Sequence, residues 1–267
     1  MITLINGDCL VEMQKIPNKS IDMILCDLPY GVLCKNNPHA QWDRIIPFDK
    51  LWEQYERIIK DNGAIVLFAQ GMFTAKLMMS NTKLWRYNLV WDKQKTTGFL
   101  NANRMPLRCH EDICVFYKAL PTYNPQYTDG EPNHARGNGK HKHTNQCYGK
   151  YKADYKKNRC YEQVPRVDST VPEGKKLPRS IISIKKEHES KTVHPTQKPL
   201  ELLEYLIRTY TNEQDTVLDN TMGSGSTMVA CINTNRNGIG IELNEEYFQI
   251  AQKRVNESTD ITNDPLY

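Results

Sequence analysis

The first 117 residues alternate short apolar runs with segments of helical periodicity. The apolar runs predict strands at residues 2–5, 21–26 and 64–69, because strands of a parallel sheet are buried on both faces and show little polar alternation. Helical spacing predicts helices at residues 10–16 and 49–60, the first stopped by Pro17 and the second closed by Asn62-Gly63. Two further strands are expected at residues 87–91 and 113–117.

The same alternation returns at the C-terminal end of the chain. The predicted order is a helix, a strand, a glycine-rich turn, a helix, a strand and a helix, at residues 199–210, 216–219, 223–227, 228–233, 238–242 and 245–255. Alternating β and α units at this spacing predict an α/β fold with a doubly wound, mostly parallel sheet.

Between these two regions the composition changes. Residues 118–193 are rich in Lys, Asn, Gly, Pro and Tyr and hold few aliphatic residues before Ile181-Ile182-Ser183-Ile184. The stretch from His134 to Lys191 contains 15 Lys or Arg against 6 Asp or Glu, so its formal charge is about +9. The whole chain has a formal charge of +4, so the remaining residues carry about −5. We interpret residues 118–193 as an inserted basic lobe between an N-terminal half, residues 1–117, and a C-terminal half, residues 194–267.

The basic lobe also contains aromatic side chains. A solvated basic loop explains the charge equally well, but Tyr148, Tyr151, Tyr155 and Tyr161 are interspersed among the lysines. Because cations bind phosphates and aromatic rings stack on bases, this mixture favours a nucleic-acid partner. The candidate phosphate contacts are Arg136, Lys140, Lys142, Lys150, Lys152, Lys156, Lys157 and Arg159.

Several other classes of protein are disfavoured. No apolar run approaches the roughly 18 residues that cross a bilayer, and the N-terminus lacks the basic start and apolar run of a secretion signal, so a cytoplasmic location without a membrane partner is expected. The eight cysteines include no Cys-x-x-Cys pair, which favours reduced thiols. His141, His143, Cys147 and Cys160 fit no standard zinc spacing, so no metal is expected.

Polar clusters follow the predicted strands, at the edge where sheets of this kind bind ligands. The segment from Asp219 to Thr227 contains Gly223-Ser224-Gly225, whose glycines let the backbone pass close to a ligand, although a plain tight turn explains it equally well. It is neither the GxxxxGK[ST] phosphate loop nor the GxGxxG of dinucleotide folds, so a nucleoside without phosphates fits better. Glu242 ends the next strand, 23 residues after Asp219, where a carboxylate can bind both hydroxyls of a ribose; a single acid there is more often simply solvated.

A third cluster, Asp27-Leu28-Pro29-Tyr30, holds the groups needed to bind a planar amino group: a carboxylate acceptor, a backbone carbonyl before a proline and an aromatic face. It resembles the catalytic tetrapeptide Asp/Asn/Ser-Pro-Pro-Tyr of the amino-directed DNA methyltransferases. Residues 219–227 resemble the cofactor turn of that family, and His194-Pro195-Thr196-Gln197-Lys198-Pro199 is similar to the block before it. The order of the motifs resembles the β group, whose target-recognition region lies in the middle.

The resemblance covers residues 1–118 and 194–255. It implies a Rossmann-like methyltransferase fold, S-adenosylmethionine as cofactor and double-stranded DNA as partner, and it leaves a homodimer open. It assigns catalysis to Asp27, Leu28, Pro29 and Tyr30; Leu28 replaces the usual proline, and its carbonyl remains an acceptor. The implied cofactor contacts are Asp8, Cys9, Asp27, Thr196, Lys198, Asp219, Asn220, Thr221, Gly223, Gly225, Ser226, Thr227, Glu242 and Leu243.

Within this set the resemblance implies individual roles. Thr196 and Lys198 are expected to reach the carboxylate of the cofactor, and Glu242 is expected to hold its ribose. Asp8 is expected at its adenine ring, a role compatible with capping the following helix.

The resemblance also implies a target and a mechanism. The expected target is N6 of an adenine extruded from the duplex and stacked on Tyr30, with Asp27 and the Leu28 carbonyl accepting the two N6 hydrogens. Trp42 and Asp43, in the loop from Val32 to Pro47, are candidates for closing over the DNA, or belong to an ordinary surface loop. The alternatives are N4 of cytosine, which the same tetrapeptide can bind, an RNA methyltransferase, and an inactive nucleic-acid-binding protein with this fold.

Overall fold

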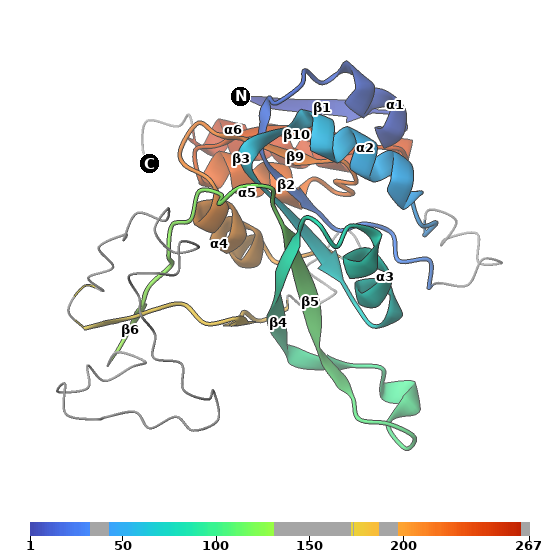
Figure 1. Cartoon of the computed structure of the whole chain (residues 1–267), viewed down its shortest axis with the longest axis vertical. Coiled ribbons are helices and arrows are strands. Elements are labelled where there is room, and N and C mark those ends of the chain that lie inside the picture. Colours follow the sequence, from blue (N-terminus) through green and yellow to red (C-terminus); the bar gives the residue numbers. More distant parts are fainter. Residues whose placement is uncertain (33–42, 131–171, 173, 187–196, 263–267) are drawn as a thin grey trace, which may run out of the picture. The chain divides into compact units, whose positions relative to one another are not determined.

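The structure is a computed structural model that describes residues 1–32, 43–130, 172, 174–186 and 197–262. It divides the chain into two compact units, which are considered separately: residues 1–124 together with 179–267, and residues 125–178 (Figure 1). The first unit contains every strand and helix that the repeated β and α pattern predicted.

An eight-stranded sheet forms the centre of the first unit. Its order is β1-β10-β9-β2-β3-β5-β4-β8, formed by Ile2–Asn6, Asn237–Glu242, Thr216–Asp219, Ile21–Cys26, Ile59–Ala69, Arg108–Phe116, Trp85–Thr97 and Ile181–Ser183. Neighbours from β1 to β3 pair in parallel, and β8 pairs in parallel with β4. Of these eight strands, β5 alone runs antiparallel to its neighbours. The predicted α/β fold with a doubly wound, mostly parallel sheet is therefore confirmed.

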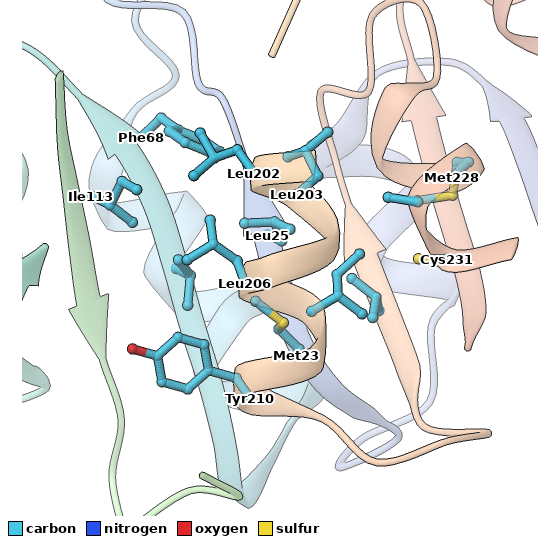
Figure 2. Close-up of a cluster of buried hydrophobic side chains, with 14 of the residues drawn as sticks. Met23, Leu25, Phe68, Ile113, Leu202, Leu203, Leu206, Tyr210, Met228 and Cys231 are labelled. Atoms are coloured by element: carbon cyan, nitrogen blue, oxygen red, sulfur yellow. The ribbon is translucent and has the colours of Figure 1, made fainter. Parts of the chain in front are cut away.

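Helices cover both faces of this sheet. One apolar cluster joins the sheet to α1, α2 and α3, formed by Cys9–Glu12, Phe48–Ile58 and Met72–Ser80. The other joins it to α4, α5 and α6, formed by Leu200–Tyr210, Ser226–Asn233 and Glu245–Thr262 (Figure 2). Strand β2 contributes to both, because Met23 and Leu25 point to one face and Ile24 and Cys26 to the other, all buried. Burial on both faces explains the uninterrupted apolar run.

The predicted end of the second helix is wrong. Helix α2 stops at Ile58 and β3 begins at Ile59, so Asn62-Gly63 lies inside the strand instead of closing the helix. The pairing of β3 with β2 shifts register between Ile21 and Met23, and a Cβ at Gly63 would lie 2.8 Å from the carbonyl oxygen of Asp22. The glycine therefore allows two strands to approach, a role that sequence does not distinguish from a helix stop.

Other boundaries differ because local patterns do not report tertiary packing. The first predicted helix is a short α1 followed by a 3₁₀ turn at Met13–Lys15. The predicted strands at residues 87–91 and 113–117 are the inner parts of β4 and β5, which extend into a long hairpin carrying a 3₁₀ turn, η3, at Phe99–Asn101. Helix α3 was not predicted, because it exposes Met72 and Met79 and its apolar positions do not follow its buried face.

The inserted segment is shorter than the composition predicted. Ile181–Ser183 is strand β8 of the main sheet, and Ile182 and Ile184 are buried in the same apolar cluster as Trp91. The separate unit spans residues 125–178 instead of 118–193, and its described residues include one antiparallel pair, β6 Thr128–Asp129 with β7 Lys175–Lys176. An edge strand within a polar stretch is recognised only by its partner, so the sequence placed this boundary too late.

Candidate active site

The carboxyl ends of β1, β10, β9 and β2 border a cavity of about 990 Å³. Such volumes are typical of small-molecule sites. Most of the predicted catalytic and cofactor residues line it: Asp8, Cys9, Asp27, Leu28, Pro29, Tyr30, Lys198, Asp219, Asn220, Thr221, Gly223, Ser226, Thr227, Glu242 and Leu243. Segments from both ends of the chain thus meet in one site.

The segment after β2 is fixed from several sides. The Tyr30 hydroxyl donates to Oδ1 of Asp27 at 2.8 Å, and the ammonium of Lys198 donates to Oδ2. The backbone carbonyl of Asp27 accepts from the Thr221 hydroxyl at 3.2 Å. Leu28 is 3 % exposed and packs into the core on the side of α1, α2 and α3, so its side chain anchors the segment where the family motif has a proline ring.

Tyr30 lies against an aromatic neighbour. Its ring stacks on Phe73 of α3 at 4.8 Å between centroids with an interplanar angle of 27°. The chain then turns at Gly31, whose φ of +68° favours glycine and whose Cβ position would lie 2.8 Å from Cγ1 of Ile45. The buried Asp43 accepts from the Gly31 backbone N–H at 2.8 Å. Asp43 therefore holds the turn that positions the Tyr30 ring.

Four charged side chains form a row through the cavity wall. From Asp27 it continues to Lys198, whose Nζ lies 3.4 Å from Oε2 of Glu111, and Oε1 of Glu111 lies 3.3 Å from Nζ of Lys93. Lys93 and Lys198 are buried, and Nζ of Lys198 also lies 4.9 Å from the centroid of the Phe68 ring. The row alternates in sign, so each buried cation is balanced.

Burial and these charges set the acidity of the row. Burial raises the pKa of Asp27. The carboxylate of Glu111 adds to this rise, and the cation of Lys198 opposes it. Burial alone would lower the pKa of Lys198, but Asp27 and Glu111 outweigh it and the pKa is raised. For Glu111 the two lysines outweigh burial, and its pKa is lowered. Sequence reasoning missed Glu111 and Lys93, since acids and lysines inside strands are ordinarily solvated.

The turn after β9 is organised around Asp219. Its Oδ2 accepts from the Thr227 hydroxyl at 2.6 Å and its Oδ1 from the Thr221 backbone N–H at 3.1 Å. The side chain is almost fully buried, and this burial raises its pKa to about 7. Gly225 has a φ of +79°, and a Cβ there would lie 2.9 Å from Cβ of Ala251, so the turn can pack closely on α6. Gly225 does not itself line the cavity.

Glu242 and Asp8 also present carboxylates to the cavity. Oε2 of Glu242 accepts from the Gly223 backbone N–H at 2.9 Å, and Oε1 from the Asn244 backbone N–H at 2.8 Å. Each carboxylate oxygen has a second lone pair, so the pair can also accept from two hydroxyl groups. Asp8 caps α1 by accepting from the Leu10 N–H at 2.8 Å and also lines the cavity. These acceptors fit a nucleoside and are unsuited to phosphates.

A buried polar group supports the floor of the site. Oδ1 of Asn220 accepts from the Tyr55 hydroxyl at 2.6 Å and lies 2.8 Å from Sγ of Cys26. Tyr55 comes from α2 and Cys26 from β2, so Asn220 fixes the turn after β9 to two other elements. The sequence pattern did not predict that Tyr55 contacts the site in this way.

Some predicted site residues lie outside the described part of the chain. They are Trp42, Thr196 and the eight basic residues of the lobe, Arg136, Lys140, Lys142, Lys150, Lys152, Lys156, Lys157 and Arg159. Their roles stay predictions, as does the absence of zinc at His141, His143, Cys147 and Cys160, which also lie outside. Among the described residues, no group of three or more His, Cys, Asp or Glu side chains is placed to hold a metal ion, and no helix is long and apolar enough to cross a membrane.

Comparison with known proteins agrees with this geometry. A family model described as DNA methylase matches residues 21–253. The Type II methyltransferase M.HinfI of Haemophilus influenzae is 28% identical over 297 residues, covering 98% of this chain and 70% of that protein. The DNA adenine methyltransferase YhdJ of Escherichia coli is 27% identical, covering 99% and 86%. M1.HpyAVI, solved as a complex with S-adenosylmethionine, is 25% identical with a TM-score of 0.61, covering 96% and 100%. Because the family model spans most of its length, the chain belongs to the DNA methylase family.

Proposed function

We propose that this DNA methyltransferase transfers a methyl group to N6 of an adenine that has been extruded from double-stranded DNA. S-adenosylmethionine is the cofactor, and when bound it supplies an electrophilic methyl group on sulfur. One observation carries the proposal: Asp27 to Tyr30 line the same cavity as Asp219 and Glu242, so a segment suited to bind an amine and a turn suited to bind a nucleoside share one site. The relationship to a protein named as a DNA adenine methyltransferase supports adenine as the target.

The residues after β2 would bind the target amine. The exocyclic nitrogen of adenine is a poor nucleophile because its lone pair is delocalised into the ring. Asp27 and the Leu28 carbonyl would accept its two hydrogens, which favours a pyramidal nitrogen with its lone pair directed into the cavity. Tyr30 would stack on the base, with Phe73 supporting the ring from its other side. Positioning and electrostatics account for the catalysis by these residues.

The cofactor would lie between the turn after β9 and the ends of β1 and β10. Glu242 would accept from the ribose hydroxyls with its remaining lone pairs, and Asp8 would lie at the adenine ring. The backbone at Gly223 would lie against the methionine part of the cofactor, and Gly225 would shape the turn from outside the cavity. An ammonium group has three donors, of which Lys198 directs one to Asp27 and lies in ion-pair distance of Glu111. It can therefore reach a cofactor carboxylate without releasing Asp27.

The central basic segment would recognise the DNA. We assign residues 1–124 to the catalytic half and residues 179–267 to the cofactor half of the main unit, and the separate unit between them, residues 125–178, to target recognition. The charge of the central stretch, about +9, supports this assignment because phosphate contacts dominate affinity for DNA. We also propose a cytoplasmic location, where DNA and the cofactor are available, and leave a homodimer to be tested by sedimentation.

The direct test is methyl transfer from tritiated S-adenosylmethionine. Label is expected on unmethylated duplex DNA and absent from RNA of the same sequence. Asp27→Ala should abolish transfer, while equilibrium dialysis shows the cofactor still bound, because Asp219 and Glu242 remain. Label on RNA alone, or none with the wild-type protein on DNA, would overturn the proposal. The transfer of label to cytosine would select the alternative target.

A further inference from the structure

The hairpin between β4 and β5 carries exposed apolar side chains at its tip. The two strands lead into a projecting tip that carries η3 (Figure 1). At its end, Phe99 is 79 % exposed, Leu100 98 % and Met105 55 %. Three large apolar residues on one turn are unusual on a protein surface and typically mark a binding site.

The same hairpin is basic. Between Gln94 and His110 the chain contains Lys95, Arg104 and Arg108 and no acidic residue. Arg104 and Arg108 are exposed, and Lys95 is partly so. A second copy of this chain would bring the same cations together, whereas a polyanion is attracted to them. The charge therefore favours a nucleic acid over self-association.

The hairpin begins at the rim of the proposed active site. Trp91 of β4 and both Arg108 and Glu111 of β5 line the cavity. The guanidinium of Arg108 donates to Oε1 of Gln70 at 3.0 Å, and Nε2 of Gln70 donates to the carbonyl of His110 at 3.0 Å. These bonds tie the outer end of the paired strands, where Arg108 lies opposite Thr97, to the residue that follows β3. The hairpin is thus fixed to the rim of the cavity.

We propose that the tip of this hairpin contacts duplex DNA beside the extruded base, with Phe99 and Leu100 packing against bases or sugars and Arg104 and Arg108 contacting phosphates. The proposal rests on the proposed function and adds a second DNA surface to the central basic segment. Apolar side chains that contact the stack beside a displaced base stabilise the distorted duplex, because they replace part of the stacking that extrusion removes.

The test compares Phe99→Ala/Leu100→Ala with a matched control, Leu120→Ala. Leu120 is 64 % exposed and lies near the end of the strands opposite to the hairpin tip, because the N–H of the neighbouring Ala119 donates to the Asp61 carbonyl near the start of β3. Initial rates of methylation would be measured against plasmid DNA and against S-adenosylmethionine. Fluorescence anisotropy with a labelled duplex would measure DNA affinity independently of catalysis.

The double variant should raise KM for DNA, or the Kd from anisotropy, by about tenfold or more. A tenfold change lies at the lower end of what the loss of one aromatic contact with a base costs. KM for the cofactor, thermal stability and the Leu120→Ala control should stay at wild-type values. Arg104→Gln should reduce the slope of log Kd against log salt by about 1.

Wild-type DNA affinity and KM in the double variant would overturn the proposal. If they were accompanied by a changed sedimentation coefficient, the tip would instead bind a second copy of the chain. Failure of the proposed function has a different signature: the wild-type protein would transfer no label, and the anisotropy comparison would still decide whether the hairpin binds DNA.

Discussion

Replacing Glu111 by Gln should damage the site in a way that a general packing defect does not reproduce. The substitution keeps the size of the side chain and removes one charge from the row Asp27, Lys198, Glu111 and Lys93. At 3.4 and 3.3 Å, each of its two ion pairs is worth about 5 kcal/mol of Coulomb energy at an effective dielectric constant of about 20. Desolvation offsets much of this, so we expect a net loss of about 3–5 kcal/mol in the free energy of unfolding, typical of a buried charge left without its partner.

The pH dependence of kcat provides the diagnostic readout. Asp27 must be ionised to accept the amine hydrogens, so kcat should fall as pH drops through its pKa. Because the Glu111 carboxylate raises that pKa, Glu111→Gln should move the acidic limb to lower pH. Lys93→Met removes a cation from the same row and should move the limb to higher pH. The double variant restores charge balance and should bring both the limb and the stability back toward the wild-type values.

The assays are urea unfolding followed by fluorescence and steady-state methylation between pH 4 and 9. The other ionisable groups near Asp27 are Tyr30, Lys198 and Asp219, and none of them is altered in these variants. The reasoning would be refuted if Glu111→Gln and Lys93→Met shifted the acidic limb in the same direction. It would also be refuted if the double variant were destabilised by the full sum of the two single variants.

Three further predictions concern individual residues. Leu28→Ala should lower the free energy of unfolding by about 2–5 kcal/mol in urea, as expected for a buried leucine; a loss below about 1 kcal/mol would show that the residue does not anchor the segment. The pKa of Asp219 is about 7 when folded, against an ordinary value of 3.8, so the wild-type protein should lose stability as pH rises from about 4 to 7. Asp219→Asn should flatten that dependence in thermal melts, whereas an unchanged profile would contradict the raised pKa. Glu242→Gln should raise KM for the cofactor about tenfold with little change in kcat, because an amide nitrogen would replace one acceptor; a large fall in kcat at unchanged KM would assign it another role.

The sequence predicted the layers of the fold because burial on both faces leaves a visible signal. Met23 to Cys26 must be apolar on both faces of β2, and Leu202, Leu203 and Leu206 must share one face of α4. Gly63 and β8 were misread because each depends on a partner far along the chain: Gly63 on Asp22, and Ile182 on Trp91. Local patterns contain no information about such partners.

The same distinction applies to the candidate site. Asp27, Tyr30, Asp219 and Glu242 could be predicted to lie together, since each ends or closely follows a strand at the edge where parallel sheets bind ligands. Glu111 could not, because it lies on the antiparallel strand β5 and its role depends on ion pairs with Lys198 and Lys93, which are distant from it in the sequence. Its neighbours in sequence are exposed or half-buried polar residues, so nothing local separates it from a solvated acid.

The identity of the methylated base tests the central claim most directly. Unmethylated duplex DNA would be incubated with the protein and S-adenosylmethionine, digested to nucleosides and analysed by mass spectrometry. N6-methyldeoxyadenosine should accumulate with time and be absent with Asp27→Ala. Accumulation of N4-methyldeoxycytidine in its place, or of no methylated nucleoside at all, would contradict the assignment.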